Sequence, residues 1–314
     1  MAATEILLRV KNYDLAATLD SGQAFRWQKE NDLWVGIVGK HPVRLAQTAD
    51  GIHATTAAPV GNWDWLRQFL QTDIDLAAVL KTFPDDEPMR AAVTACPGLR
   101  LLKQDPWECL ASFILSSTKH IVQIRQIIAL LCERFGEPVP SNFGLRWQSA
   151  AATALSPAMK SSESGVALRL LPQSKIVQYS FPSPEKIAAC TEAELRACKM
   201  GFRAPSLLAA AREIAEGRFD LERIQQLPHA EARAELMELR GVGGKIADCV
   251  LLFAYGFDAA FPVDVWIERA LQRLYFPRRR ASEQRLRRFA ATHFGPHAGY
   301  AQQYLFHYIR TKLN

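Results

Sequence analysis

Lys245 and Asp264 are the two residues of this sequence whose surroundings most clearly predict chemistry. Lys245 follows a glycine-rich turn and begins an apolar segment, 245–255, that is typical of a buried helix. The positive end of a helix dipole disfavours an ammonium ion, and a neutral amine is a nucleophile. Asp264 precedes an apolar stripe at helical spacing, so we expect an ionised N-cap there. Taken singly, each residue could also be an ordinary surface lysine or cap.

The turn in front of Lys245 predicts a helix-hairpin-helix. Residues 231–239 are expected to form a helix with their apolar side chains on one stripe. The turn follows this helix and contains Gly241, Gly243 and Gly244. Glycine permits positive φ and the close approach of a foreign backbone. Because the N–H groups of such a turn and of the next helix suit a phosphate, we expect these glycines to lie at a phosphate-binding site.

The lysine, the hairpin and the aspartate together resemble one known family. Gly-Val-Gly-Gly-Lys-Ile-Ala-Asp-Cys ends at Cys249, and Phe-Pro-Val-Asp-Val begins at Phe261. Both runs resemble the helix-hairpin-helix (HhH-GPD) DNA glycosylases, and in detail the 8-oxoguanine DNA glycosylase/AP lyases. The resemblance implies that Lys245 attacks the sugar C1′ and that Asp264 assists both the nucleophile and the oxocarbenium-like sugar. The resulting Schiff base would permit β-elimination at the 3′ phosphate.

Two further runs resemble the same family and imply a pocket for the damaged base. In Gly-Gln-Ala-Phe-Arg-Trp, the carbonyl of Gly22 is implied to accept a hydrogen bond from N7–H, a donor that guanine lacks. An undamaged base would leave both acceptors unsatisfied. In Ala-Gln-Gln-Tyr-Leu-Phe, Gln302 is implied to read the Watson–Crick edge and Phe306 to stack on the ring, with Cys249 against the other side. Gly22 could instead only form a turn between strands.

Other segments imply contacts with the DNA around the lesion. Met-Gly-Phe-Arg-Ala resembles the family's Gly-Tyr-Arg-Ala, which implies that Phe202 wedges into the base stack and that Arg203 contacts the orphan base or its phosphate. Phe202 could instead belong to the core. The run from Asp105 to Ser117 also resembles the family, but asparagines and an arginine that reads cytosine are expected after it. This chain has Thr118 and Gln123 there, so we expect a weaker preference for cytosine opposite the lesion.

The strand and helix patterns predict an α+β fold. Residues 1–84 are expected to form an N-terminal antiparallel β domain, because short β-branched and aromatic runs alternate with turn residues. Residues 85–314 are expected to form two mostly α-helical lobes that contain the helix-hairpin-helix, with the active site between them. Residues 148–165, which are rich in Ala and Ser, are expected to form a flexible insertion. The strands are expected at 5–10, 24–27, 33–38 and 42–46, and a helix at 63–80.

Composition and charge agree with a DNA-binding enzyme. From Arg240 onward twelve Lys/Arg oppose five Asp/Glu, whereas the whole chain carries a net charge of +6. The expected partner is double-stranded DNA containing oxidised guanine, bound by a monomer. The six cysteines include no Cys-x-x-Cys, so we expect reduced thiols and neither metal nor cofactor. Without a signal sequence or a membrane-length apolar run, we expect an intracellular protein, in the cytoplasm or nucleoid of a prokaryote or a eukaryotic nucleus.

Two alternatives stay open at the level of sequence. A glycosylase for another damaged purine, such as an alkylpurine, would typically lack the lysine and carry an electron-rich aromatic pocket. A non-catalytic protein could use the hairpin only to hold DNA phosphates. The Lys245–Asp264 pair argues against both, and absence of strand scission would favour the second.

Overall fold

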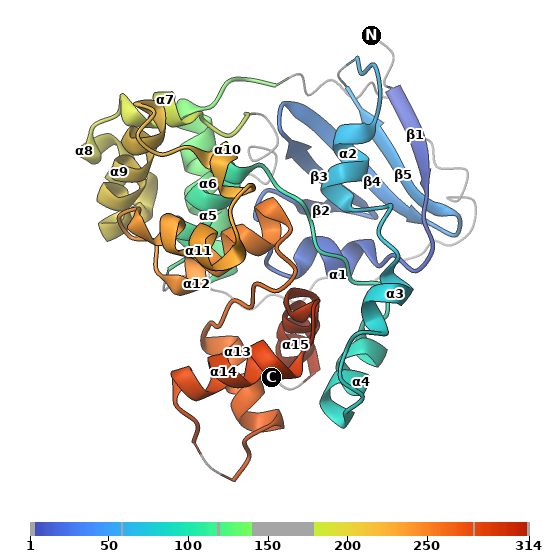
Figure 1. The fold of residues 1–314 in the computed structure, drawn as a ribbon. Coiled ribbons are helices and arrows are strands. Elements are labelled where there is room, and N and C mark those ends of the chain that lie inside the picture. Colours follow the sequence, from blue (N-terminus) through green and yellow to red (C-terminus); the bar gives the residue numbers. More distant parts are fainter. Residues whose placement is uncertain (1–3, 58, 118–119, 140–178, 279, 313–314) are drawn as a thin grey trace, which may run out of the picture.

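The computed structural model describes residues 4–57, 59–117, 120–139, 179–278 and 280–312. Within these ranges an antiparallel sheet is followed by a helical region, so the α+β prediction is confirmed. Figure 1 shows the helices in two groups, with α5–α12 beside the sheet and α13–α15 next to α3 and α4. The expected insertion at 148–165 lies outside the described residues, and the domain boundary after residue 84 stays a prediction.

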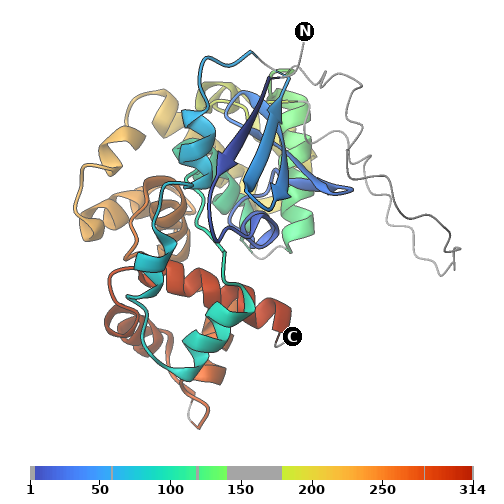
Figure 2. The ribbon, with the colours of Figure 1, turned by 90° about the vertical axis from the view of Figure 1, so that its right-hand side faces the viewer.

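The described part of the N-terminal region forms a five-stranded sheet in the order β1-β5-β4-β3-β2. Alternate side chains such as Leu8, Leu45 and Ile52 are fully buried, because period-2 alternation places them on one face. Helices α1 and α2 contribute to the same apolar cluster, and Figure 2 shows α2 lying along the sheet. The elements are β1 (Thr4–Arg9), α1 (Leu15–Asp20), β2 (Gln28–Glu30), β3 (Leu33–Val38), β4 (His41–Thr48), β5 (Gly51–Thr56) and α2 (Asp64–Leu70).

Three local predictions in this region were wrong. Residues 24–27 form no strand, and all four of their side chains are buried. Phe25 packs in the core of the helical region, whereas Ala24 and Trp27 pack in the core under the sheet. Arg26 pairs with Glu108 at 3.0 Å. The fifth strand, β5, was not expected from the sequence. The predicted helix at 63–80 is divided into α2 and α3 (Leu76–Leu80), because Gln71 adopts the left-handed conformation with φ 52° and ends α2.

Most of the described α-helices begin after a Ser, Thr or Asp N-cap, the type of signal that the sequence predicted at Asp264. Asp105 accepts a hydrogen bond from the Glu108 N–H at 2.8 Å, and proline follows as the first helical residue. No helix among the described residues is long and apolar enough to span a membrane. The helices are α4 (Glu87–Ala95), α5 (Pro106–Ser116), α6 (Ile121–Phe135), α7 (Pro184–Ala188), α8 (Glu192–Leu195), η2 (Arg196–Met200), η3 (Gly201–Arg203), α9 (Ala204–Ala215), α10 (Leu221–Ile224), α11 (His229–Glu238), α12 (Gly244–Val250), η4 (Leu251–Tyr255), α13 (Val265–Leu274), α14 (Glu283–His293) and α15 (Ala298–Lys312).

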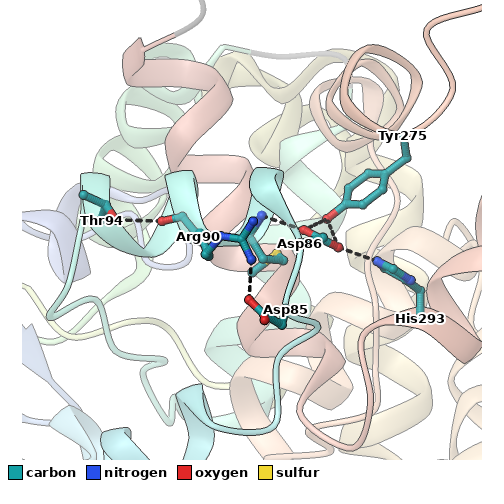
Figure 3. A network of polar contacts seen from close by, with 7 residues as sticks. Asp85, Asp86, Arg90, Thr94, Tyr275 and His293 are labelled. Atoms are coloured by element: carbon teal, nitrogen blue, oxygen red, sulfur yellow. Dashed lines mark hydrogen bonds and ion pairs between the residues drawn. The ribbon is translucent and has the colours of Figure 1, made fainter.

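A polar network ties α4 to the last helices of the chain (Figure 3). Asp86 caps α4 by accepting a hydrogen bond from the Met89 N–H. Its carboxylate also accepts a hydrogen bond from the Tyr275 hydroxyl at 3.2 Å. The same carboxylate lies 2.7 Å from Nε2 of His293 on α14. Helix α4 also packs on α15. The segment that follows the sheet therefore helps to hold the C-terminal helices in place.

The helix-hairpin-helix consists of α11 and α12 joined by the predicted turn. Gly241 has φ +85°, a conformation that L side chains rarely adopt. A Cβ at Gly244 would lie 2.2 Å from Nη2 of Arg233, so this glycine leaves room for an ion pair. Arg233 donates to Asp248 on α12 at 2.7 Å, and Arg287 on α14 donates to the same carboxylate at 3.2 Å. Asp248 therefore holds the two hairpin helices and α14 together.

We expect Asp248→Ala to lower the free energy of unfolding by about 2 kcal/mol, less than for a fully buried pair, because both arginines remain partly hydrated. Side-chain exposure is 5% for Asp248 and 31% for Arg233. Urea denaturation would measure the change, and Asp85→Ala, at a carboxylate that is 90% exposed, is the control. Equal effects of the two substitutions would contradict the bridging role of Asp248.

Candidate active site

A cavity of about 330 Å³ is lined by residues from both groups of helices. Its walls come from the end of α1, from α5, α6, α12 and η4, and from α13 and α15. Six residues that the sequence singled out for catalysis or base binding line this one cavity, although they lie in four separate parts of the chain. They are Gly22, Lys245, Cys249, Asp264, Gln302 and Phe306.

The ammonium group of Lys245 sits at the start of α12 and points into the cavity. Its Nζ donates a hydrogen bond to Oγ of Ser116 at 3.3 Å and lies 5.1 Å from the ring centroid of Phe113. The Ser116 hydroxyl in turn donates to the Phe113 carbonyl at 2.8 Å. Phe113 stacks on Phe253 at 5.6 Å, so the Nζ of Lys245 lies beside a pair of stacked aromatic rings. Among the described residues, the Lys245 amine thus has one weak hydrogen-bond partner, which leaves it able to reach a reacting carbon.

Cys249 lies one helical turn after Lys245 and is 3% exposed. Burial raises the pKa of the Cys249 thiol to about 12, and the positive charge of Lys245 only partly offsets this effect. The thiol is therefore protonated at neutral pH. A protonated thiol is a poor nucleophile but a suitable packing surface for a flat apolar ring.

Asp264 is the N-cap of α13, as predicted. Its Oδ1 accepts a hydrogen bond from the Ile267 N–H at 2.8 Å, which fixes the carboxylate at the cavity wall. The preceding segment is held from α15, because Nε2 of Gln302 donates to the Pro262 carbonyl at 3.1 Å. Oε1 of Gln302 is buried, and no described residue offers it a hydrogen bond. A buried acceptor without a partner costs free energy, and a donor on a bound ligand would satisfy it.

Gly22 lies in a rigid loop at the end of α1 with φ +79°. The next residue, Gln23, is fully buried; its Nε2 donates to the Arg100 carbonyl at 2.8 Å, and its Oε1 accepts from the Leu102 N–H at 2.8 Å. Gln303 on α15 donates to the Ser21 carbonyl at 2.9 Å. These bonds fix the backbone on both sides of Gly22, so its position in the cavity is set before any ligand arrives.

Those expected DNA-contacting residues that the structure describes lie outside the cavity lining. Phe202 is 64% exposed on the short η3 turn, as a wedge residue would be and a core residue would not. Arg203 is only 3% exposed, with its guanidinium 4.3 Å from the Phe202 ring centroid. The Gln123 side chain accepts a hydrogen bond from the His120 N–H at 3.3 Å in a capping box at the start of α6. Thr118 lies outside the described residues.

Sequence reasoning missed several residues that line or shape the cavity. Ser116 and Phe113 belong to a run that resembled the family, but their spacing gave no sign that they meet Lys245. Trp266 was not singled out as a site residue either, although it lines the cavity, and its ring lies 5.4 Å from the Arg269 guanidinium. Arg310 was not singled out. Its signal was available, because it continues the four-residue spacing of Gln302 and Phe306 on α15.

Comparison with known proteins shows which family the sequence of this chain matches. The model of the 8-oxoguanine DNA glycosylase N-terminal domain matches residues 5–110, and that of the HhH-GPD superfamily of base excision DNA repair proteins matches residues 111–295. The chain is 33% identical over 230 residues to a probable N-glycosylase/DNA lyase of Methanothermobacter thermautotrophicus, covering 73% of this chain and 69% of that protein. It is 28% identical over 288 residues to the N-glycosylase/DNA lyase of Saccharomyces cerevisiae, covering 83% and 68%.

Solved structures agree. The 8-oxoguanine glycosylase/lyase of Clostridium acetobutylicum, in complex with double-stranded DNA that carries cytosine opposite 8-oxoguanine, is 27% identical with a TM-score of 0.81. The match covers 98% of this chain and 99% of that one. The family-model matches together span both the sheet and the helices that line the cavity. This chain belongs to the HhH-GPD superfamily of base excision DNA repair proteins and carries the N-terminal domain of the 8-oxoguanine DNA glycosylases.

Proposed function

We propose that this protein is a bifunctional DNA glycosylase/AP lyase that excises 8-oxoguanine from duplex DNA and then cleaves the strand. The observation that carries the proposal is the convergence of Lys245 and Asp264 with Gly22, Gln302 and Phe306 on one cavity. A nucleophile beside a base-sized, partly apolar pocket suits a reaction at the carbon that joins sugar and base. Because that bond is inaccessible within the helical stack, the nucleotide must be extruded into the cavity.

The base-binding residues each have a distinct role in this proposal. The Gly22 carbonyl accepts the N7–H of 8-oxoguanine, and its fixed loop cannot turn away to relieve an unmatched guanine. Gln302 supplies the buried Oε1 for a donor on the Watson–Crick edge. Phe306 and the protonated thiol of Cys249 enclose the two faces of the ring.

The proposed chemistry begins with the neutral amine of Lys245. Its lone pair forms the bond to C1′ while the bond from C1′ to the base breaks, and the base leaves with the electron pair and takes up a proton. Asp264, anchored by its cap, stabilises the positive charge that develops on the sugar. Opening of the sugar ring gives the Schiff base, and loss of a proton from C2′ then expels the 3′ phosphate.

The proposed DNA-binding face lies around this cavity. The turn of Gly241, Gly243 and Gly244 offers backbone N–H groups to phosphates, Phe202 fills the space left by the extruded base, and Arg203 swings toward the orphan base. A monomer suffices, because a single chain supplies every one of these groups. Gln123 replaces an arginine in the region expected to read the opposite base, so we propose a relaxed preference for cytosine.

Two alternatives are separated by one experiment. Duplexes with 8-oxoguanine, unmodified guanine or an alkylated purine are incubated with the protein, and released base and cut strands are measured. We expect release only from the 8-oxoguanine duplex, accompanied by strand scission, and less than ~10-fold variation across the four opposite bases. Release of the alkylpurine alone would favour the alkylpurine glycosylase, and binding without release or scission would favour a non-catalytic DNA-binding protein.

A further inference from the structure

Arg310 is a cationic residue of the base cavity to which none of the roles above assigns a task. It lies near the end of α15 and lines the same cavity as Lys245. Its guanidinium carbon is 5.2 Å from the ring centroid of Phe306. Its Nη1 lies 3.7 Å from the point where a Cβ on Gly22 would stand. Arg310 is thus directly beside the groups expected to hold the base.

Among the residues that the structure describes, Arg310 forms no direct ion pair. Burial lowers the pKa of Arg310, the carboxylates of Asp20 and Asp264 partly offset this effect through space, and the charge of Arg125 adds to it. The Asp20 carboxylate already pairs with Arg125 at 2.8 Å, and Oδ1 of Asp264 accepts from the backbone of α13. A partly desolvated cation without a directly bonded counter-ion costs free energy, and a bound anion would recover part of it.

The position of Arg310 along α15 indicates which part of a nucleotide it meets. Gln302, Phe306 and Arg310 follow one another at four-residue intervals, so they form one stripe with steps of ~6 Å. Gln302 is 4% exposed at the inner end, whereas Phe306 and Arg310 are partly exposed. An extruded nucleotide has the same order, from base edge through ring to sugar and phosphate. With its base on Gln302 and Phe306, its sugar–phosphate lies level with Arg310.

We propose that the guanidinium of Arg310 binds a phosphate that flanks the extruded nucleotide. A guanidinium presents two parallel N–H donors, which match two phosphate oxygens better than any neutral group of the base would. The inference rests on the proposed function, because extrusion is what brings this phosphate to the cavity. Arg310 is then a positioning residue: it holds the sugar against Lys245 and Asp264 and takes no part in bond exchange.

The test uses duplex DNA with a tetrahydrofuran abasic analogue, which has neither a base nor a glycosidic bond. We expect Arg310→Gln to weaken binding of this duplex ~10-fold and Arg310→Lys, which keeps the charge, to weaken it ~3-fold. A neutral methylphosphonate placed on the 5′ or the 3′ side of the analogue should weaken wild-type binding ~10-fold on one of the two sides. On that side, Arg310→Gln should lose nothing further, because the pair is already broken.

The control is Arg90→Gln, which removes one positive charge from an exposed side chain paired with Asp85 outside the cavity lining. This variant should respond to the methylphosphonate as the wild type does. Thermal melting of each variant would establish that it is folded, and Arg310→Lys keeps the test valid if Arg310→Gln is unstable.

Three results would overturn the proposal. Unchanged affinity of Arg310→Gln for the tetrahydrofuran duplex would exclude a phosphate contact, and a loss confined to 8-oxoguanine excision would assign Arg310 to the base instead. If the losses of affinity caused by Arg310→Gln and by the methylphosphonate were additive, Arg310 would only pack on Phe306 and would not bind that phosphate. Because the binding assay needs no base release, a protein that failed to excise 8-oxoguanine would still give a clear answer on Arg310.

Discussion

Lys245→Gln is expected to abolish both base release and strand cleavage, with a loss of at least ~10³-fold in the rate of 8-oxoguanine excision. Glutamine keeps the approximate length of the side chain but has no lone pair able to form a Schiff base. Borohydride should therefore trap a covalent protein–DNA adduct with the wild type and none with the variant. Binding to the lesion duplex should change little by comparison, because the cavity and the hairpin are retained.

The control for this substitution is Lys29→Gln, at an exposed position on β2. This variant loses the same charge, and borohydride should trap as much covalent protein–DNA adduct with it as with the wild type. A residual adduct with Lys245→Gln would mean that another amine of the protein can form the Schiff base. The thiol of Cys249 is excluded from that role, because borohydride reduces an imine and a thiol forms none.

Gly22→Ala is expected to lower excision of 8-oxoguanine ~100-fold while leaving cleavage at a preformed abasic site within ~3-fold of the wild type. The new Cβ would lie 3.1 Å from Cδ1 of Ile121 and 3.4 Å from Cε1 of Phe306, in the space that the base must enter. An abasic site has no base to exclude, so the lyase step at Lys245 should proceed. The measurement is the rate of 8-oxoguanine excision divided by the rate of cleavage at the abasic site, with both rates taken from the same enzyme preparation.

Gly39→Ala is the matched control for backbone strain. Gly39 also has positive φ, +59°, but apart from its chain neighbours no described residue has an atom within 4 Å of the point where its Cβ would stand. Both substitutions should cost roughly 1 kcal/mol of stability, because alanine is disfavoured in the left-handed region. Only Gly22→Ala should change the ratio of the two rates. An equal loss on both substrates would mean that Gly22→Ala disturbs Lys245 and Asp264 rather than the base pocket.

The sequence predicted those features of the site that depend on neighbours along the chain. The hairpin turn follows from glycines that tolerate positive φ, and the cap at Asp264 follows from an acceptor side chain placed just before an apolar helical stripe. The stripe of Gln302 and Phe306 follows from helical spacing in the same way. Local signals also misled: buried side chains at 24–27 were interpreted as a strand, and Gln71 divided a helix whose apolar pattern was continuous.

Only the tertiary structure decided how these pieces meet. Ser116 approaches Lys245 from a helix 129 positions earlier in the chain, and Gln303 fixes the Gly22 loop from a helix 282 positions beyond Ser21. That Arg310 has no direct ion-pair partner among the described residues likewise depends on which carboxylates the packing leaves within reach. Periodicity and propensity describe a residue's neighbours on its own element. A cavity is formed by side chains of different elements, whose relative placement is set by how the two groups of helices and the sheet bury their apolar faces together.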